Sequence, residues 1–379
     1  VTLDASLIAG KSAHLMLTGE LPLAVDATMA LHAVGTADLA LLNPILTANG
    51  RQVRGKLSLD ANIAGTISAP RVTGSGKLSG GEVQDYSRGI RIRAIDAAIE
   101  AKGNAIQITR FSGHAGPGTI TASGTIDLAA PGLPVDITIQ AKNARPIVSD
   151  RMTAVLSGNV KLSGKLYGVL ALSGSIDVAR GEIDIPSDFP PEVATLNVRR
   201  RGEPLPPPHS AGSVTLDVTV STSGQVFVRG HGIDAEVAGR IHLSGTSGEP
   251  LVTGGFDMKR GTLAVAGQTL VFTSGRVSFD GTGVRSRLDP TLNFVAQTTS
   301  GGVTATLTIS GYASAPKIAL SSSPELPQDE VLAHLLFQQS AKQLTPLQLG
   351  EIAQGLASLG GIGSGFNPLG TVRKFLGLD

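Results

Sequence analysis

The stretch Val303-Thr-Ala-Thr-Leu-Thr-Ile-Ser310 decides the fold class, because its residues alternate strictly between apolar and polar. A period of two places every aliphatic side chain on one face of a β-strand and every polar side chain on the other. Similar alternation recurs around Leu57, Val135, Leu216 and Ile241. Gly, Ser-Gly and Pro interrupt these segments roughly every 8–12 residues, as in a protein of many short strands joined by turns. We therefore expect an all-β protein of roughly 20 strands, with no helical periodicity before about residue 325.

The composition of the 379-residue chain fits a folded β-protein with an unusual interior. Hydrophobic residues make up 41% of the chain, but aromatic residues only 3%, and Trp is absent. A disordered chain would lack the aliphatic residues. An ordinary core would use more aromatic side chains, because they bury the most area per residue. The aliphatic strand faces therefore have few large side chains available to fill the space between them.

The charged and metal-binding residues exclude several classes of function. The 31 basic and 30 acidic residues nearly balance, and no basic stripe with interleaved aromatic residues occurs, so we expect no nucleic-acid partner. The absence of Cys excludes disulfides, thiolate metal sites and cysteine nucleophiles. None of the seven His residues has the spacing of a zinc site, and His231 with Asp234 fits a solvated turn better than a metal site. We expect neither an enzyme nor a cofactor.

The segment Ala5-Ser-Leu-Ile-Ala-Gly10-Lys11-Ser12 matches a relaxed phosphate-binding-loop pattern. Such a loop needs a helix directly after the Lys-Ser pair, so that the helix N-terminus faces the phosphates. Here Leu15 and Leu17 continue the alternation of a strand. The segment therefore predicts a turn between two strands.

A loose repeat marks several of the expected strand connections. Gly65 to Pro70 resembles Gly245 to Pro250 and Gly311 to Pro316, and the stretch from Gly164 to Gly174 has Val169 in place of the Pro. Gly suits positive φ in a turn, and Pro suits the first position of a strand. The spacing between copies varies, so we expect an array of similar hairpins instead of a solenoid of fixed period.

The composition divides the chain into four expected segments. These are a repetitive β segment over 1–185, a Pro-rich loop over 186–212, a second β segment over 213–320 and a helical C-terminal segment over 321–379. No apolar run reaches the length of a membrane-spanning helix, and the chain begins at Val1 instead of Met. We expect it to be a fragment that lacks an anchoring segment.

The helical segment predicts two short amphipathic helices. Val331, Leu332 and Leu335 lie on one helical face, and Thr345 with Gln348 forms a capping-box pattern at the start of a second helix. Their polar faces carry Glu and Gln instead of the Lys and Arg of a membrane-surface helix. We therefore expect these helices to cover an end of the sheet.

Several blocks in the C-terminal part of the chain resemble the C-terminal β-rich region of the TamB family of AsmA-like bridge proteins. The most specific block runs Leu320-Ser-Ser-Ser-Pro-Glu-Leu-Pro-Gln-Asp-Glu-Val-Leu-Ala-His-Leu-Leu-Phe337. Family members have Gly after this block, where this chain has Gln338. Other matching blocks are Leu243 to Pro250, Arg260 to Leu263, Gly275 to Phe279, Asp289 with Pro290, and Val303 to Gly311. The earlier part of the chain resembles the family in style more than in motif.

The resemblance implies an elongated sheet curled into a U-shaped groove, called a β-taco, with an apolar interior. It also implies a periplasmic protein held at the inner membrane by a segment outside this fragment, with membranes at both ends of the full-length protein. The implied partners are phospholipids and a TamA- or BamA-like outer-membrane barrel. The implied role is conduction of phospholipid acyl chains to the outer membrane, together with support of outer-membrane protein and autotransporter assembly. No catalytic residues are carried over.

The alternating aliphatic residues are the expected lining of this groove, because each buried methylene contributes about 0.8 kcal/mol. The predicted lining residues are Leu57, Leu59, Ile63, Val135, Ile137, Ile139, Leu216, Val218, Val220, Leu263, Val265, Leu307 and Ile309. A second hypothesis is a β-rich scaffold or chaperone that binds a barrel protein by strand addition without lipid transport. A third is a closed sandwich or solenoid with a self-filled core.

Overall fold

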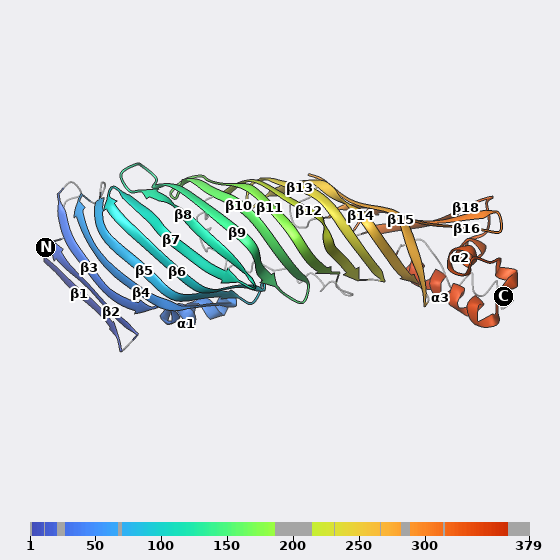
Figure 1. Ribbon diagram of the computed structural model, residues 1–379, viewed down its shortest axis with the longest axis horizontal. Coiled ribbons are helices and arrows are strands. Elements are labelled where there is room, and N and C mark those ends of the chain that lie inside the picture. Colours follow the sequence, from blue (N-terminus) through green and yellow to red (C-terminus); the bar gives the residue numbers. More distant parts are fainter. Residues whose placement is uncertain are drawn as a thin grey trace, which may run out of the picture. The chain divides into compact units, whose positions relative to one another are not determined.

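The computed structural model in Figure 1 describes residues 2–10, 12–20, 27–66, 70–185, 214–230, 232–265, 267–281, 289–313 and 315–362. The expected Pro-rich loop over 186–212 and the predicted turn residue His231 lie outside the described residues. The chain divides into two compact units. The first unit comprises Val1–Ala179, Phe189–Val220 and Leu243–Pro250, and the second comprises Arg180–Asp188, Ser221–His242 and Leu251–Asp379.

The described residues form eighteen strands of one mostly antiparallel sheet, which confirms the all-β prediction. The strands are β1 Thr2–Ala9, β2 Ala13–Glu20, β3 Met29–Asp38, β4 Arg51–Gly65, β5 Pro70–Asp85, β6 Ile90–Gly103, β7 Ala105–Ala115, β8 Gly118–Asp127, β9 Pro134–Val148, β10 Met152–Lys165, β11 Leu170–Asp184, β12 Val214–Gly230, β13 Ile233–Gly245, β14 Pro250–Val265, β15 Gln268–Asp280, β16 Thr291–Ser300, β17 Val303–Tyr312 and β18 Ala315–Ser323. Within the first unit, consecutive strands from β1 to β10 pair antiparallel. Figure 1 shows β3 to β9 side by side, each bending along its length.

Many strands are longer than the Gly and Pro punctuation alone indicates, because much of the glycine lies inside strands. Gly74 in β5 and Gly124 in β8 have φ of +139° and +157°. A Cβ at these positions would lie 2.2 Å from the Asp60 carbonyl oxygen and 2.1 Å from that of Asp136. Glycine therefore allows the neighbouring backbone to approach at points within the sheet, without ending the strand.

The repeated Gly-to-Pro stretches form hairpin connections, as predicted. Gly65 ends β4 and pairs with Pro70, the first residue of β5. Gly245 ends β13, and Pro250 begins β14. Both glycines have positive φ, +89° and +80°. The two stretches therefore form the same kind of turn, with a Gly of positive φ at the end of one strand and a Pro at the start of the next.

The phosphate-loop pattern is also a hairpin, as predicted. β1 and β2 pair antiparallel, and Ala9 lies opposite Ala13 at the turn. The described residues after the turn form strand β2, so the helix that a phosphate-binding loop needs does not follow.

No helical periodicity precedes about residue 325 in the sequence, but the structure has a short helical excursion at the connection between β3 and β4. This connection holds the 3-10 helices η1 (Leu39–Leu42) and η2 (Thr47–Asn49) around the short helix α1 (Asn43–Leu46). The Asp38 carboxylate caps η1 by accepting from the backbone N–H of Ala40 at 2.9 Å. The Asn43 amide binds both backbone groups of Val53, at 2.9 and 3.0 Å, as a neighbouring strand would. Local capping and this anchor hold a helical excursion too short to show helical periodicity.

Two longer helices follow the sheet in the second unit, α2 (Gln328–Phe337) and α3 (Pro346–Ile362), with the 3-10 helix η3 (Ala341–Gln343) between them. The predicted capping box is present, because the Thr345 backbone N–H donates to Gln348 Oε1 at 2.9 Å. No helix within the described ranges is long and apolar enough to span a bilayer.

Candidate functional site

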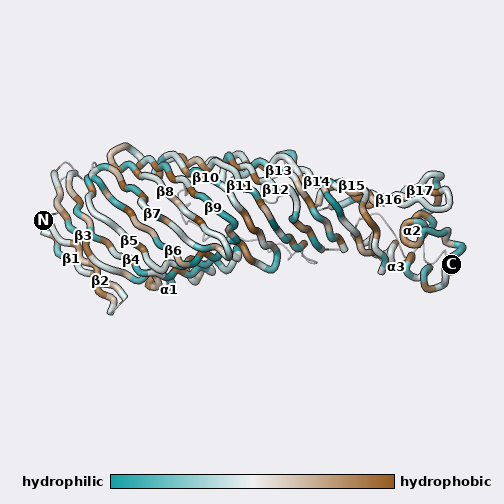
Figure 2. The backbone as a smooth tube through the Cα atoms, viewed as in Figure 1, coloured by the Kyte–Doolittle hydropathy of each residue, from teal (hydrophilic) through white to brown (hydrophobic). Residues whose placement is uncertain are grey.

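The first unit places aliphatic side chains in rows that run across its strands. Residues directly opposite each other in an antiparallel pair share a sheet face. One row takes a residue from each strand from β1 to β10: Leu7, Leu15, Gly35, Leu59, Gly76, Ile99, Ile108, Gly124, Ile137 and Leu162. An adjacent row takes Ala5, Leu17, Ala33, Ala61, Gly74, Ala101, Ile106, Ile126, Val135 and Gly164. We call these two rows the aliphatic face, and Figure 2 shows hydrophobic and hydrophilic positions alternating along the strands that carry it.

Glycine within the rows makes room for the large side chains beside it. A Cβ on Gly76 would lie 3.0 Å from Ile99 Cγ1 and 3.7 Å from Leu59 Cδ1. The two flanking side chains therefore close over the glycine, and the row stays continuous across three strands.

The opposite face of the same strands is polar. Asp60, Glu100 and Asp136 follow or precede the row residues of β4, β6 and β9, and each is well exposed. Lys161 Nζ pairs with Asp136 across β9 and β10 at 2.8 Å, and Lys102 Nζ lies 2.9 Å from Glu100. Exposed pairs of this kind add little stability, about 0–1 kcal/mol each. The face opposite the rows is therefore mostly polar from β4 to β10, whereas on β1 to β3 it also carries Ile8, Met16 and Val34.

The described part of the first unit has no second layer over the aliphatic face. Leu59, Ile99 and Ile137 are only half-buried. The helical excursion Leu39–Asn49 makes its main contacts with β4. A sheet normally buries its apolar face against another element. Although Ala61 and Val135 in the rows are buried, the large side chains Leu59, Ile99 and Ile137 remain partly exposed, so the aliphatic face is an apolar surface that the described residues cover only in part.

In the second unit, an apolar sheet face of the same kind is covered by helices. Across β15 to β18, opposite residues form a row of Phe272, Ala296, Leu307 and Leu320 and a row of Gly275, Phe294, Ile309 and Ile318. Val331, Leu332 and Leu335 of α2 and Ile352 and Leu356 of α3 join these residues in one buried cluster. The Phe272 and Phe294 rings lie 5.4 Å apart, a favourable aromatic distance. Here α2 and α3 cover the sheet, as the sequence predicts.

The family follows from comparison with known proteins. The model of the TamB C-terminal domain matches residues 109–379 of this chain. The chain belongs to the TamB family. This confirms the resemblance drawn from the C-terminal blocks. A curated TamB relative, the translocation and assembly module subunit TamB of Haemophilus influenzae, is 22% identical over 376 residues. That alignment covers 92% of this chain and 28% of the relative, so the chain spans a little over a quarter of that TamB protein.

The predicted lining residues of this TamB-family chain fall into three groups. Six of them lie on the same face of β4 and β9: Leu57, Leu59, Ile63, Val135, Ile137 and Ile139. Leu216, Val218 and Val220 lie on β12, where Val218 is buried. Leu263, Val265, Leu307 and Ile309 belong to the buried cluster of the second unit. The role of all thirteen in lipid contact stays a prediction.

Sequence reasoning missed the middle of the aliphatic face, on β6 to β8. Ile99, Ile108 and Ile126 lie there between the predicted residues of β4 and β9. The register shifts between β5 and β6, and Ala94 takes a positive φ of +48° beside the shift. The alternation changes phase at this β-bulge, so a strict period of two fails to connect the two halves of the strand. The sequence does show this change: the apolar residues are even-numbered at Ile90 and Ile92 and odd-numbered at positions 95, 97 and 99.

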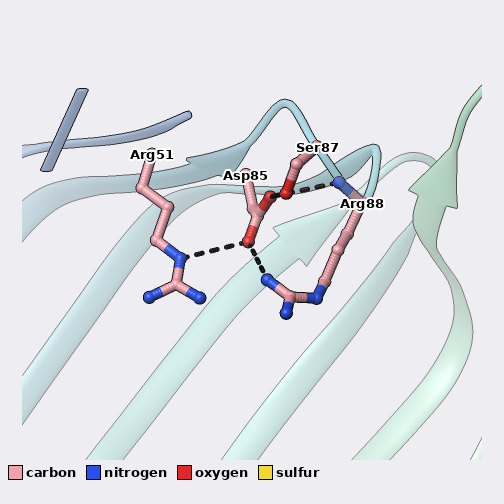
Figure 3. Close-up of polar contacts among 4 residues, drawn as sticks. All are labelled: Arg51, Asp85, Ser87 and Arg88. Atoms are coloured by element: carbon pink, nitrogen blue, oxygen red, sulfur yellow. Dashed lines mark hydrogen bonds and ion pairs between the residues drawn. The ribbon is translucent and has the colours of Figure 1, made fainter. Parts of the chain in front are cut away.

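A polar cluster closes the turn between β5 and β6 (Figure 3). The Asp85 carboxylate accepts from the Ser87 hydroxyl at 2.6 Å and from the Arg88 backbone N–H at 3.1 Å. Arg88 Nη1 and Arg51 Nε donate to its other oxygen at 2.9 and 3.2 Å. The Ser87 hydrogen bond, followed by the Arg88 and Arg51 contacts, holds the pKa of Asp85 far below its ordinary value of 3.8, although burial opposes this. Four donors fix this carboxylate, so its role is to lock the turn.

Metal-ligating side chains do not gather into a candidate metal site within the described residues. The described part of the chain contains no group of three His, Cys, Asp or Glu side chains that could hold a metal ion. Two shallow hollows of the first unit include Thr125, Val135 and Asp136 in one case and Asn159 and Lys161 in the other, so the first reaches the edge of the aliphatic face at Val135. The aliphatic face is therefore the candidate functional site.

Proposed function

We propose that the aliphatic face of the first unit binds the acyl chains of phospholipids and lets them pass along its rows. The observation that carries this proposal is a pair of apolar rows crossing β1 to β10 without a covering layer in the described residues. A contiguous exposed apolar surface of this kind marks a binding surface. The proposed action is binding and guidance of a substrate, without covalent chemistry.

The hydrophobic effect supplies the reason for such a surface. Moving a chain of ~16 methylenes from a bilayer into water costs roughly 12 kcal/mol. Contact with Leu59, Ile99 and Ile137 replaces most of the lost lipid contacts. The polar head group stays in water, because the rows form an open surface. Nothing in this arrangement holds one lipid at one position.

Membership of the TamB family supports a proposed envelope setting for this activity. The relative's name assigns it to a translocation and assembly module, and we propose the same setting for this chain. It would act in the periplasm as part of a protein held at the inner membrane, with phospholipids and a TamA- or BamA-like outer-membrane barrel as partners. Passage of phospholipid to the outer membrane would support the assembly of outer-membrane proteins and autotransporters there.

Matched pairs of photoreactive residues test the proposed binding surface. A photoreactive amino acid replaces Leu59, Ile99 or Ile137 on the aliphatic face, or the neighbouring Asp60 or Glu100 on the polar face. The purified chain is irradiated with phospholipid vesicles, and lipid adducts are identified by mass spectrometry. We expect adducts from the three apolar positions and only background from the polar ones. Equal adducts from both faces, or none from either, contradict the proposal.

Charge on the aliphatic face tests transport separately from partner binding. We expect Leu59→Asp with Ile99→Asp to lower lipid transfer between vesicles by about tenfold or more, because a carboxylate among acyl chains is costly to desolvate. Ser58→Asp on the polar face is the control. If the double variant transfers lipid normally but fails to bind the barrel partner, the strand-addition scaffold is the better hypothesis.

A further inference from the structure

Helix α2 lies on an apolar sheet face of the kind that the first unit leaves open. The rows that it covers contain Ala296, Leu307 and Ile309, and the side chain of Leu307 is fully buried. Val331, Leu332 and Leu335 of α2 contact this cluster and are themselves buried. Three aliphatic side chains thus occupy the position that an acyl chain would take on an open face.

The attachment of α2 to the strands is mainly apolar. In the described residues, the polar side-chain contact between α2 and the strands is a hydrogen bond of 2.8 Å between His334 Nδ1 and Ser300 Oγ. The Glu330 carboxylate binds within the helical segment instead, to Ser340 and to the backbone N–H of Ala341. Apolar contacts carry no directional requirement, so another apolar group can replace them.

The helix is also too short to be stable by itself. It spans ten residues, and isolated helices of fewer than about 12–15 residues are marginal in water. Its fold therefore depends on its neighbours, the sheet beneath it and α3, which share one buried cluster with it. The linker before it contains Pro324 and Pro327, and after it Gln338 takes a left-handed φ of +57°, so the helix has a defined end on each side.

We propose that α2 is a displaceable cover over a second acyl-chain site, formed by the rows of β15 to β18. The ligand class is a phospholipid acyl chain, and the inference rests on the proposed function of the aliphatic face. With no lipid present, α2 fills the site and keeps the second unit free of an exposed apolar surface. An acyl chain that reaches these strands exchanges with the side chains of Val331, Leu332 and Leu335, and α2 lifts.

A phospholipid with a diazirine in its acyl chain tests this cover, because the lipid itself reports each surface that it reaches. The purified chain is irradiated with vesicles that contain this lipid, and labelled peptides are quantified. Leu332→Ala removes a buried contact of α2, and Leu347→Ala, on a side chain of α3 that is 75% exposed, is the matched control. We expect Leu332→Ala to raise labelling of the β16 and β17 peptides roughly tenfold, with Leu347→Ala unchanged. Circular dichroism confirms that both variants keep their strand content.

A tether gives the opposite test. The chain has no native Cys, so Ser300→Cys with His334→Cys places two unique thiols at the contact between β16 and α2. A short cleavable thiol cross-linker between them should reduce labelling of β16 and β17 to background, and cleavage should restore it. If neither Leu332→Ala nor the tether changes the labelling of β16 and β17, the proposal that α2 is a displaceable cover is wrong. Absence of label on β4 to β9 as well would instead refute the proposed function itself.

Discussion

The apolar faces of β3 to β9 and of β15 to β18 have the same strand pattern but differ in the elements that pack on them. Both come from alternating strands whose opposite residues align into apolar rows. The first is aliphatic, uses Gly and Ala freely, and leaves large side chains such as Leu59, Ile99 and Ile137 only half-buried. The second adds the rings of Phe272 and Phe294 and receives α2 and α3. A strand pattern therefore specifies an apolar face, but the elements packed on it decide whether that face is a core or a binding surface.

The same substitution in the two faces should give the largest contrast. Leu307 is fully buried, so Leu307→Ala should lower the free energy of unfolding of the second unit by about 3–4 kcal/mol, from lost transfer energy and a cavity. Leu59 is half-buried on an uncovered face, so Leu59→Ala should cost about 1 kcal/mol or less. Denaturant unfolding followed by circular dichroism measures both. Equal losses would mean that the aliphatic face is a closed core after all.

Two glycines beside large side chains should sharpen this contrast. A Cβ on Gly275 would lie 2.5 Å from the ring of Phe294, which the covered cluster holds in place. Gly275→Ala should therefore destabilise the second unit by about 1–3 kcal/mol. A Cβ on Gly76 would lie 3.0 Å from Ile99 Cγ1, and the Ile99 side chain is only half-buried. Gly76→Ala should lower the free energy of unfolding by less than about 1 kcal/mol. A destabilisation as large as that of Gly275→Ala would show that the Ile99 side chain is packed under another element.

Acidification should have the smallest effect on the free energy of unfolding, and it should destabilise both units. Contact with Ser87, Arg88 and Arg51 lowers the pKa of Asp85. The backbone N–H of Gln225, followed by Arg260, lowers the pKa of Glu236 in the second unit. A lowered pKa in the folded state means that each carboxylate stabilises the fold above its ordinary value, 3.8 for Asp85 and 4.5 for Glu236. This contribution is lost as the pH falls below those values through the pKa of the folded state.

The two carboxylates can be separated by variants. We expect Asp85→Asn to flatten the acid dependence of hydrogen exchange at the β5–β6 turn, and Glu236→Gln to do so near Gln225. Each variant should leave the other site unchanged. If Asp85→Asn left the acid dependence at its own turn intact, a different group would be responsible for it.

Local chemistry made much of the fold predictable. The alternation of β17 appears directly in its burial pattern, and the Gly65-to-Pro70 stretch is a hairpin. The Thr345 and Gln348 capping box also forms as its spacing predicts. These features depend on residues close together in the sequence, so their physics can be read from the sequence itself.

Features that depend on distant residues were harder to predict. The excursion around α1 is held by the Asn43 side chain on the backbone of Val53, a contact that no periodicity reports. The bulge in β6 changes the phase of the alternation, so the sequence pattern did not identify Ile99 or the middle of the aliphatic face. Nor does alternation alone distinguish Leu59 from Leu307, because Leu307 is a core residue through its packing with the C-terminal helices α2 and α3.

The row from Leu7 to Leu162 repeats at the spacing of its strands, about 4.8 Å. A chain of ~16 carbons laid along it would cross roughly four strands at once. Moved by one strand, it would meet nearly the same set of methyl groups and glycine hollows as before. If the aliphatic face binds acyl chains as proposed, this repetition would give a shallow energy profile, which would favour diffusion along the rows over storage at one position.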